Sequence, residues 1–325
     1  MRVMVTGAAG FIGYHVAQAL LARGSSVVGV DDLNSYYDVT LKRARLARLE
    51  TWPAFSFHQL DIADHQALRT VASDIEVIVH LAAQAGVRYS IDNPFAYAAS
   101  NLTGHLSVLE VARHAPKFRH LIYASSSSVY GGGSALPYSE AARADRPQSL
   151  YAATKRADEM MSVAYAHLYG LRQTGLRFFT VYGPWGRPDM AYFGFAEAIM
   201  AGRPIILYDG GRLKRDFTFI DDIIDGVMGV IDHPPEPECA HRLYNIGNNK
   251  AELVSDLVSK LEAELGRRAI ITVAPRPAAD PVETCANVSA LTELTGFTPK
   301  TTLDQGLPQF VAWYREWYEL RGLTA

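Results

Sequence analysis

Short apolar runs alternate with longer helical patterns through the first half of the chain, and this alternation constrains the fold more than any other feature. Some of the short runs, such as Val77–Val79, are apolar without interruption, as expected of strands covered on both faces. Strands separated by helices build a parallel sheet with helices on both sides. We therefore predict an α/β fold with a doubly wound parallel sheet.

The expected elements follow from this pattern. We predict strands at Val3–Thr6, Ser26–Val30, Ser56–Gln59, Val77–Leu81, His120–Ala124, Leu176–Phe179 and Tyr244–Ile246. The segments long enough for helices are Phe11–Arg23, Val39–Glu50, Gln66–Ser73, Pro94–His114 and Tyr151–Leu168.

The texture of the chain changes after Tyr182. The run Gly183–Pro188 cannot form regular helix, and further proline and glycine clusters follow it. We predict a large domain over residues 1–181 and a smaller C-terminal lobe over residues 182–214 and 249–325. The segment around 215–248 is expected to rejoin the large domain. Such a lobe would lie over the carboxyl edge of the sheet, where open α/β sheets bind ligands.

Composition excludes several classes of function. The chain has 325 residues, and its net charge of -3 gives no reason to expect nucleic acid or an anionic membrane as a partner. Its two cysteines, Cys239 and Cys285, form no pair, and no His-Glu-x-x-His pattern occurs, so no metal is expected. No run of some 18 apolar residues is present. We expect a soluble, cytoplasmic protein.

A basic stretch, Lys42–Arg48, could suggest nucleic-acid binding. Its cations recur at helical spacing within the segment Val39–Glu50. We therefore interpret it as the solvated face of a helix.

A glycine-rich turn follows the first predicted strand and opens the first helix. Backbone N–H groups at such a turn can approach a pyrophosphate closely. The turn and the start of the helix comprise Gly7, Gly10, Phe11, Ile12 and Gly13. The second strand ends at Asp31 and Asp32, which can accept hydrogen bonds from ribose hydroxyls and would repel a 2′-phosphate. NAD is therefore favoured over NADP.

A second pattern carries acid–base chemistry. Tyr151 and Lys155 are four residues apart and share one face of a helix. A nearby ammonium favours the phenolate form of tyrosine, which can act as a base. The preceding strand ends in Ser125–Ser128, whose hydroxyls can hold the oxygen that Tyr151 deprotonates.

The glycine spacing G-x-x-G-x-x-G resembles that of the extended short-chain dehydrogenase/reductase superfamily, whose large domain has the Rossmann fold. The resemblance implies that Asp61 and Ile62 contact the adenine ring and that Leu81, Ala82 and Ala83 line the pyrophosphate. It also implies that Asn34, Asn101 and Phe178, with Tyr151 and Lys155, lie against the NAD cofactor.

The run Ser125–Gly131 and the segment Tyr151–Lys155 resemble the catalytic signature of nucleotide-sugar epimerases and dehydratases. The resemblance makes Ser126 the catalytic hydroxyl, beside Tyr151 and Lys155, and places Ser127 and Ser128 near the sugar. Related dehydratases carry Asp-Glu before Val-Tyr-Gly, and related decarboxylases carry a Glu there. This chain has only serines, so we expect hydride chemistry at C4 and epimerisation.

The segment Arg177–Ala191 resembles the UDP-glucuronate 4-epimerases. It implies that Arg187 pairs with a C6 carboxylate and that Thr180 lies beside the sugar. Arg215 stands where relatives bind the diphosphate. Arg276 and Asp280 resemble an Arg-x-x-Asp element for diphosphate and ribose, although the spacing here is one residue longer.

Together these features predict an NAD-dependent 4-epimerase that interconverts UDP-glucuronic and UDP-galacturonic acid through a 4-keto intermediate. A UDP-glucose/UDP-galactose 4-epimerase remains an alternative. A UDP-glucuronate decarboxylase and a non-catalytic NAD-binding regulator are less favoured. A homodimer is expected, because two helices carry apolar residues around much of their circumference and related enzymes pair through these helices. These residues are Tyr97, Leu102, Leu106, Leu109, Met160, Met161, Val163 and Leu168.

Overall fold

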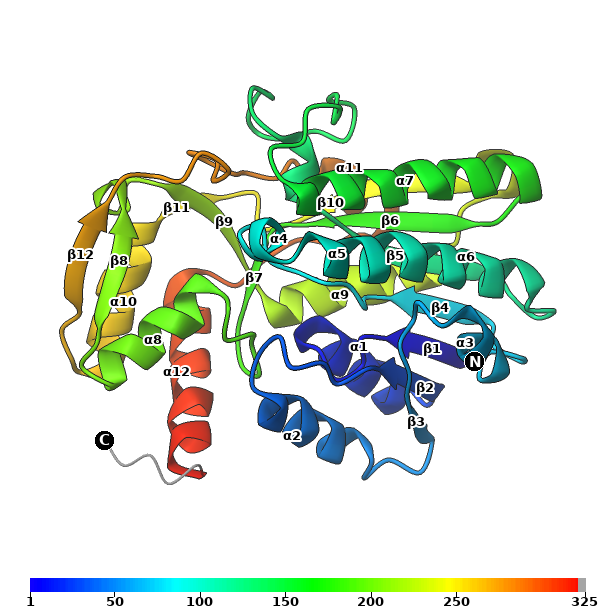
Figure 1. Ribbon diagram of the computed structural model, residues 1–325, viewed down its shortest axis with the longest axis horizontal. Coiled ribbons are helices and arrows are strands. Elements are labelled where there is room, and N and C mark those ends of the chain that lie inside the picture. The colour runs from blue at the N-terminus through cyan, green and yellow to red at the C-terminus, as the bar shows by residue number, and fades with distance from the viewer. Residues whose placement is uncertain (321–325) are drawn as a thin grey trace.

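The computed structural model describes residues 1–320, and its centre is a seven-stranded sheet in which every neighbouring pair is parallel (Figure 1). In spatial order the strands are β10 (His241–Ile246), β6 (Gln173–Phe178), β5 (His120–Ser126), β4 (Val77–His80), β1 (Arg2–Thr6), β2 (Ser26–Asp31) and β3 (Phe55–Gln59). The order reverses direction between β1 and β4, as in a doubly wound Rossmann sheet. The predicted fold class is confirmed.

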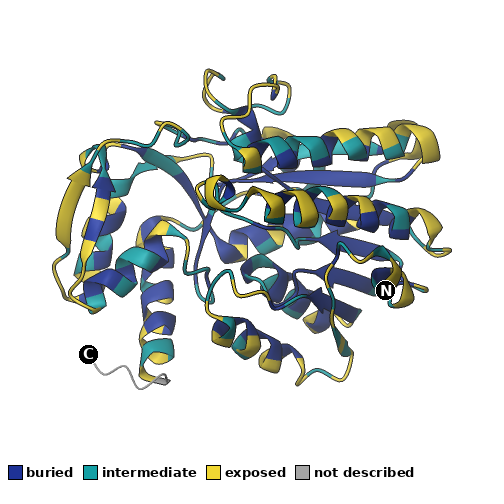
Figure 2. Ribbon diagram, in the orientation of Figure 1, coloured by how far each residue is buried: buried dark blue, intermediate teal, exposed yellow. Residues whose placement is uncertain are grey.

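Helices cover both faces of this sheet. On one face lie α1 (Phe11–Ala22), α2 (Val39–Leu49) and α9 (Ile220–Asp232), and on the other lie α3 (His65–Thr70), α6 (Gly104–His114) and α7 (Leu150–Tyr169). Strand β1 shows why both are needed. Val3 and Val5 pack into one apolar cluster, while Met4 packs into the other. Figure 2 shows the sheet buried and the outer helix faces exposed.

Several predicted elements differ from the structure in their bounds; strand β10, for example, begins at His241 and not at Tyr244. The predicted helix over residues 94–114 is divided into α5 (Pro94–Tyr97), a π-helical segment η1 (Ala98–Thr103) and α6. Strand β6 begins three residues earlier than predicted, at Gln173. The reason is that Gln173 and Thr174 are buried although they are polar, and Gln173 Nε2 donates to the Ser162 carbonyl at 2.8 Å.

The smaller lobe is built on two further sheets. Strand β8 (Pro204–Tyr208) pairs in parallel with β12 (Ile270–Ala274), and β9 (Lys214–Phe219) lies between β7 (Thr180–Tyr182) and β11 (Ala251–Leu253). The helices of the lobe are α8 (Ala191–Met200), α10 (Val254–Leu265) and α12 (Leu303–Leu320). The remaining short elements are α4 (Tyr89–Asp92), η2 (Ser127–Tyr130), η3 (Asp209–Gly211), η4 (Pro237–Cys239) and α11 (Ser289–Thr295).

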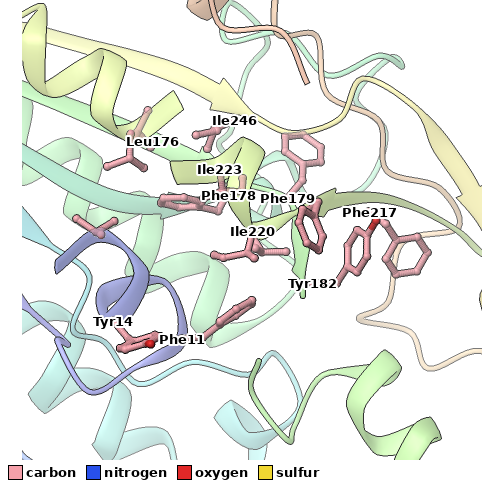
Figure 3. Close-up of a cluster of buried hydrophobic side chains, with 14 of the residues drawn as sticks. Phe11, Tyr14, Leu176, Phe178, Phe179, Tyr182, Phe217, Ile220, Ile223 and Ile246 are labelled. Atoms are coloured by element: carbon pink, nitrogen blue, oxygen red, sulfur yellow. The ribbon is translucent and has the colours of Figure 1, made fainter. Parts of the chain in front are cut away.

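The chain passes between the two parts more than once. Within the segment 215–248, α9 and β10 lie with the large sheet, whereas β9 belongs to the three-stranded sheet. Residues 289–295, which we had assigned to the smaller lobe, instead form α11 against α9 and β10. Aromatic and aliphatic side chains from both parts form one buried cluster (Figure 3). They include Phe11, Tyr14, Leu176, Phe178, Phe179, Tyr182, Phe217, Ile220, Ile223 and Ile246.

No helix within residues 1–320 is long and apolar enough to span a bilayer.

Candidate active site

A cleft of about 840 Å³ opens at the carboxyl edge of the large sheet, and residues of both parts line it. The lining includes residues from the glycine turn, from β5, from α7 and from the smaller lobe. Every site residue predicted from the sequence lines this cleft except Asn101 and Arg276. The predicted cofactor and substrate residues therefore share one space.

The glycine turn has no room for larger residues. Gly7 has a φ of +72°, and a Cβ atom there would lie 2.8 Å from the Ala82 nitrogen. A Cβ on Gly13 would lie 2.0 Å from the Gly7 carbonyl oxygen, so the start of α1 packs directly on the turn. Helix α1 also begins without a side-chain cap, which leaves N–H groups at its first turn for an anion.

The acids at the end of β2 lie next to this turn. Asp31 accepts hydrogen bonds from the Ala9 nitrogen at 3.1 Å and the Leu33 nitrogen at 2.9 Å. Burial raises the pKa of Asp31, while the nearby Lys42 ammonium, 3.9 Å away, lowers it. The uncapped helix, the crowded glycines and an acid at this position fit the pyrophosphate and ribose of NAD.

The basic helix face that we interpreted as solvated is partly buried, so this prediction is wrong for two of its cations. Lys42 donates to Asn34 Oδ1 at 3.1 Å. Arg45 is fully buried, and its guanidinium donates to the carbonyl oxygens of Ala9, Trp185 and Gly186 at 2.7–3.1 Å. Local sequence spacing could not predict these contacts of Arg45, because its partners include a loop some 140 residues further along the chain.

Tyr151 lies in the first turn of α7, on the wall of the cleft. The helix begins there because Ser149 caps it by accepting from the Ala152 nitrogen at 3.1 Å. One turn later, Lys155 Nζ donates to the Ala124 carbonyl at 2.9 Å and to Asp158 Oδ2 at 3.1 Å. The lysine is therefore fixed between α7 and the end of β5, one helical turn beyond Tyr151.

The serines at the end of β5 divide into two groups. Ser126 Oγ lies 3.1 Å from Ser128 Oγ, and both line the cleft with Ser127. Ser125 also belongs to the lining, but it donates to Glu159 Oε1 at 2.6 Å, and Glu159 accepts two further hydrogen bonds from Arg177. This buried Glu159–Arg177 pair joins α7 to β6 and thereby fixes the serine run. Sequence reasoning missed it.

In the loop between β7 and α8, Arg187 lines the cleft and is already paired with an acid of its own chain. Its Nε donates to Asp189 Oδ1 at 3.0 Å and its Nη2 to Asp189 Oδ2 at 2.8 Å. Tyr36 adds a hydrogen bond to Asp189 Oδ2 at 3.3 Å. Although burial opposes the charged form, the Asp189 carboxylate raises the pKa of Arg187. Thr180, at the start of β7, also lines the cleft.

Two further arginines, Arg215 and Arg88, belong to the lining of the cleft. Arg215 lines it, and burial lowers the pKa of its guanidinium. Arg88, which sequence reasoning missed, donates to Asp280 Oδ2 at 2.7 Å and stacks over Tyr208 at 4.5 Å. Arg276 is outside the lining and donates to the Asp280 backbone. Of the two residues of the Arg-x-x-Asp resemblance, only Asp280 lines the cleft.

Asn101 does not line the cleft, contrary to expectation. It is buried, and its side chain accepts from the Gln84 nitrogen at 2.8 Å and donates to Thr154 Oγ1 at 2.9 Å. Asn101 instead holds Gln84 in place by hydrogen bonding, and Gln84 lines the cleft. Within residues 1–320, no group of three or more His, Cys, Asp or Glu side chains could hold a metal ion.

Comparisons with known proteins agree with this geometry. The model of the NAD dependent epimerase/dehydratase family matches residues 3–247. An uncharacterized 37.6 kDa protein of Escherichia coli O111:H- is 47% identical over 98% of this chain and 100% of its own length. A probable UDP-glucuronate 4-epimerase of Rhizobium meliloti is 45% identical over 98% of both chains.

A solved structure extends the comparison to the whole fold. The UDP-glucuronic acid 4-epimerase of Bacillus cereus, in complex with UDP-glucuronic acid and NAD, superimposes with a TM-score of 0.92 at 33% identity. That likeness covers 98% of this chain and 100% of the other. The family match covers well over half of the chain and joins the glycine turn to the Ser–Tyr–Lys group in one model. The chain belongs to the NAD dependent epimerase/dehydratase family.

Proposed function

We propose that this chain is a UDP-glucuronate 4-epimerase, which inverts C4 and so interconverts UDP-glucuronic acid and UDP-galacturonic acid. The Rhizobium relative and the Bacillus cereus structure carry this activity in their names. The strongest structural support for this proposal is the position of Arg187. Its guanidinium shares the cleft with the serine run and lies within electrostatic range of Tyr151.

The roles of the side chains follow from their places. The Tyr151 hydroxyl takes the proton of the C4 hydroxyl and later returns it, and the fixed Lys155 ammonium stabilises the phenolate. Ser126 Oγ holds the same sugar oxygen. The glycine turn and Asp31 would hold NAD, which would supply the hydride chemistry at C4. Arg187 holds the C6 carboxylate by charge-assisted hydrogen bonds.

The residues after Ser126 support epimerisation over related reactions. Dehydration and enzyme-assisted decarboxylation need a further acid or base near C5 and C6. The 3-10 turn η2 offers Ser127 and Ser128 at the cleft, and both side chains are neutral hydroxyls.

We further propose that the enzyme is a homodimer paired through α6 and α7. Four apolar side chains on the outer faces of these helices are 42–64% exposed, namely Leu106, Met160, Val163 and Leu168. Tyr97 and Leu109, which we had counted with them, are buried within the chain and cannot contribute.

The test is to incubate the purified protein with UDP-glucuronic acid, without added reductant, and to identify the product by NMR. We expect UDP-galacturonic acid and no CO2, because the hydride returns to the carbon that lost it. UDP-glucose and UDP-galactose should be tested in parallel. A UDP-pentose with CO2 would identify a decarboxylase, and absence of turnover with all these sugars would leave a binding protein.

A further inference from the structure

The Arg187–Asp189 pair is an unusual arrangement for a residue expected to select a negatively charged sugar. The two side chains form a fork of two hydrogen bonds at 3.0 and 2.8 Å within the loop between β7 and α8. Both belong to the lining of the cleft. Within residues 1–320 the hydrogen bonds of this guanidinium come from Nε and Nη2, and Nη1 makes none. A sugar carboxylate therefore meets an arginine that already has a counter-ion.

Asp189 is held in place by more than the arginine. Tyr36, in the loop after β2, donates to its Oδ2 at 3.3 Å, and the Tyr36 ring packs on Tyr89 at 4.8 Å. The side chains of Asp189 and Arg187 are only 20% and 26% exposed. The acid is thus a fixed part of the cleft wall and not a mobile surface group.

This pairing changes how the cleft distinguishes sugars. An unpaired arginine would reject a neutral hexose strongly, because its buried charge would stay without a partner. With Asp189 present, a neutral C6 hydroxymethyl group leaves no charge unpaired. A C6 carboxylate gains contact with Arg187 but also meets repulsion from the Asp189 carboxylate a few ångströms further away.

We propose that Asp189 is the resident counter-ion of Arg187 and that it limits the preference of the enzyme for a uronic acid over a neutral hexose. The proposal rests on the proposed function, since Arg187 must face C6 of the sugar. Asp189 acts through Arg187 and is a positioning and charge-compensating residue. The proposal predicts that removing the charge of Asp189 increases the selectivity for the uronic acid over the neutral hexose. If Asp189 only oriented Arg187, its removal would lower that selectivity.

The test compares UDP-glucuronic acid with UDP-glucose in the Asp189→Asn variant. The amide keeps the size of the side chain and one oxygen that can accept from Nε or Nη2. We expect KM for UDP-glucuronic acid to fall about three- to tenfold and KM for UDP-glucose to stay unchanged or rise, with kcat changed less than about twofold for both sugars. Both sugars carry the same diphosphate, so the ratio of their kcat/KM values isolates the effect at C6.

Two variants serve as controls. Asp189→Glu keeps the charge and should keep the wild-type ratio within about twofold. Glu197→Gln removes one negative charge on α8, where Glu197 forms an exposed pair with Arg203, and should leave the kinetics with both sugars unaffected. If Asp189→Asn does not fold, Asp189→Ser tests the same sign with a smaller neutral side chain.

The proposal would be overturned if the ratio of kcat/KM for UDP-glucuronic acid to kcat/KM for UDP-glucose were unchanged or lower in Asp189→Asn. It would also be overturned if Glu197→Gln raised that ratio equally. If the wild-type protein turns over neither sugar, the proposed function fails instead. Titration calorimetry with UDP-glucuronic acid and UDP-glucose then still decides the role of Asp189, because binding of the C6 group does not require turnover.

Discussion

Lys155 has two protein partners, and together they fix where its charge acts. Its ammonium is bound to the Ala124 carbonyl and to Asp158. Asp158 is fully buried and its Oδ1 has no partner. Burial raises the pKa of Asp158 to about 7, while Lys155 lowers it. The ammonium therefore stands against the end of β5 and not in solvent.

Tyr151→Phe tests the proton transfer directly. The change removes only the hydroxyl, so we expect kcat to fall at least about 100-fold while the affinity for UDP-glucuronic acid changes less than about threefold. Steady-state kinetics and titration calorimetry measure the two effects. The control is Tyr169→Phe at the other end of α7, an exposed tyrosine under Arg113. Residual activity above about a hundredth would remove Tyr151 from the role of base.

Single residues also show how far the sequence could lead. The glycine turn, Asp31 and the Tyr151–Lys155 pair were predictable because their spacing follows from local geometry. Partners brought together by the fold were not. Arg45 reaches a distant loop, and Arg177 of β6 pairs with Glu159 of α7, yet neither contact leaves a periodic signal in the chain.

Among the elements, α6 and α7 carry the most informative surfaces. Their inner faces pack on the sheet through residues such as Val108 and Leu109, and both helices touch each other. Their outer faces keep Leu106 and Val163 at 42% and 45% exposure. Periodicity alone predicted apolar residues all round, but it could not separate the buried from the exposed ones. The π-helical segment η1 interrupts the predicted helix. It contains no proline or glycine that could have indicated this interruption.

The proposed pairing of α6 and α7 predicts the effect of a charge. Val163→Glu should convert the dimer into monomers, because a carboxylate buried in an apolar interface loses its hydration without gaining a partner. Sedimentation analysis at micromolar concentration measures the mass. The control is Val273→Glu on β12, where the residue replaced is 64% exposed and far from these helices in sequence. A wild-type monomer, or equal masses for all three proteins, would contradict the pairing.

For the molecule as a whole, buried histidines determine the response to acid. Burial is the largest cause that lowers the pKa of five of them. These are His15 and His241, lowered to about 4, His80 and His120, lowered to about 3, and His105. The unfolded chain takes up these protons near pH 6.5, before the folded chain does. The contribution of these histidines to the free energy of unfolding is therefore fully present above pH 6.5 and is lost as the pH falls. Asp158 and Asp216, with raised pKa values, offset part of this loss.

His120→Gln tests this linkage away from the cleft. His120 lies at the start of β5 and contacts Thr174 Oγ1 at 2.9 Å, a contact that glutamine can replace. We expect the variant to lose about 1.4 kcal/mol less stability per pH unit than the wild type between pH 6 and 4.5. Urea unfolding at several pH values measures the slopes. The exposed His233→Gln is the control, and parallel slopes for all three proteins would refute the assignment.

Arg45 has a consequence for protein engineering. Its one guanidinium holds the glycine turn at Ala9 and the loop at Trp185 and Gly186 that precedes Arg187. The segment that binds the cofactor and the segment that binds the sugar are therefore structurally coupled through Arg45. A chimaera that exchanged residues 183–190 with a relative would have to keep backbone carbonyls in reach of Arg45. Otherwise a change made to alter sugar preference would also weaken retention of the nucleotide.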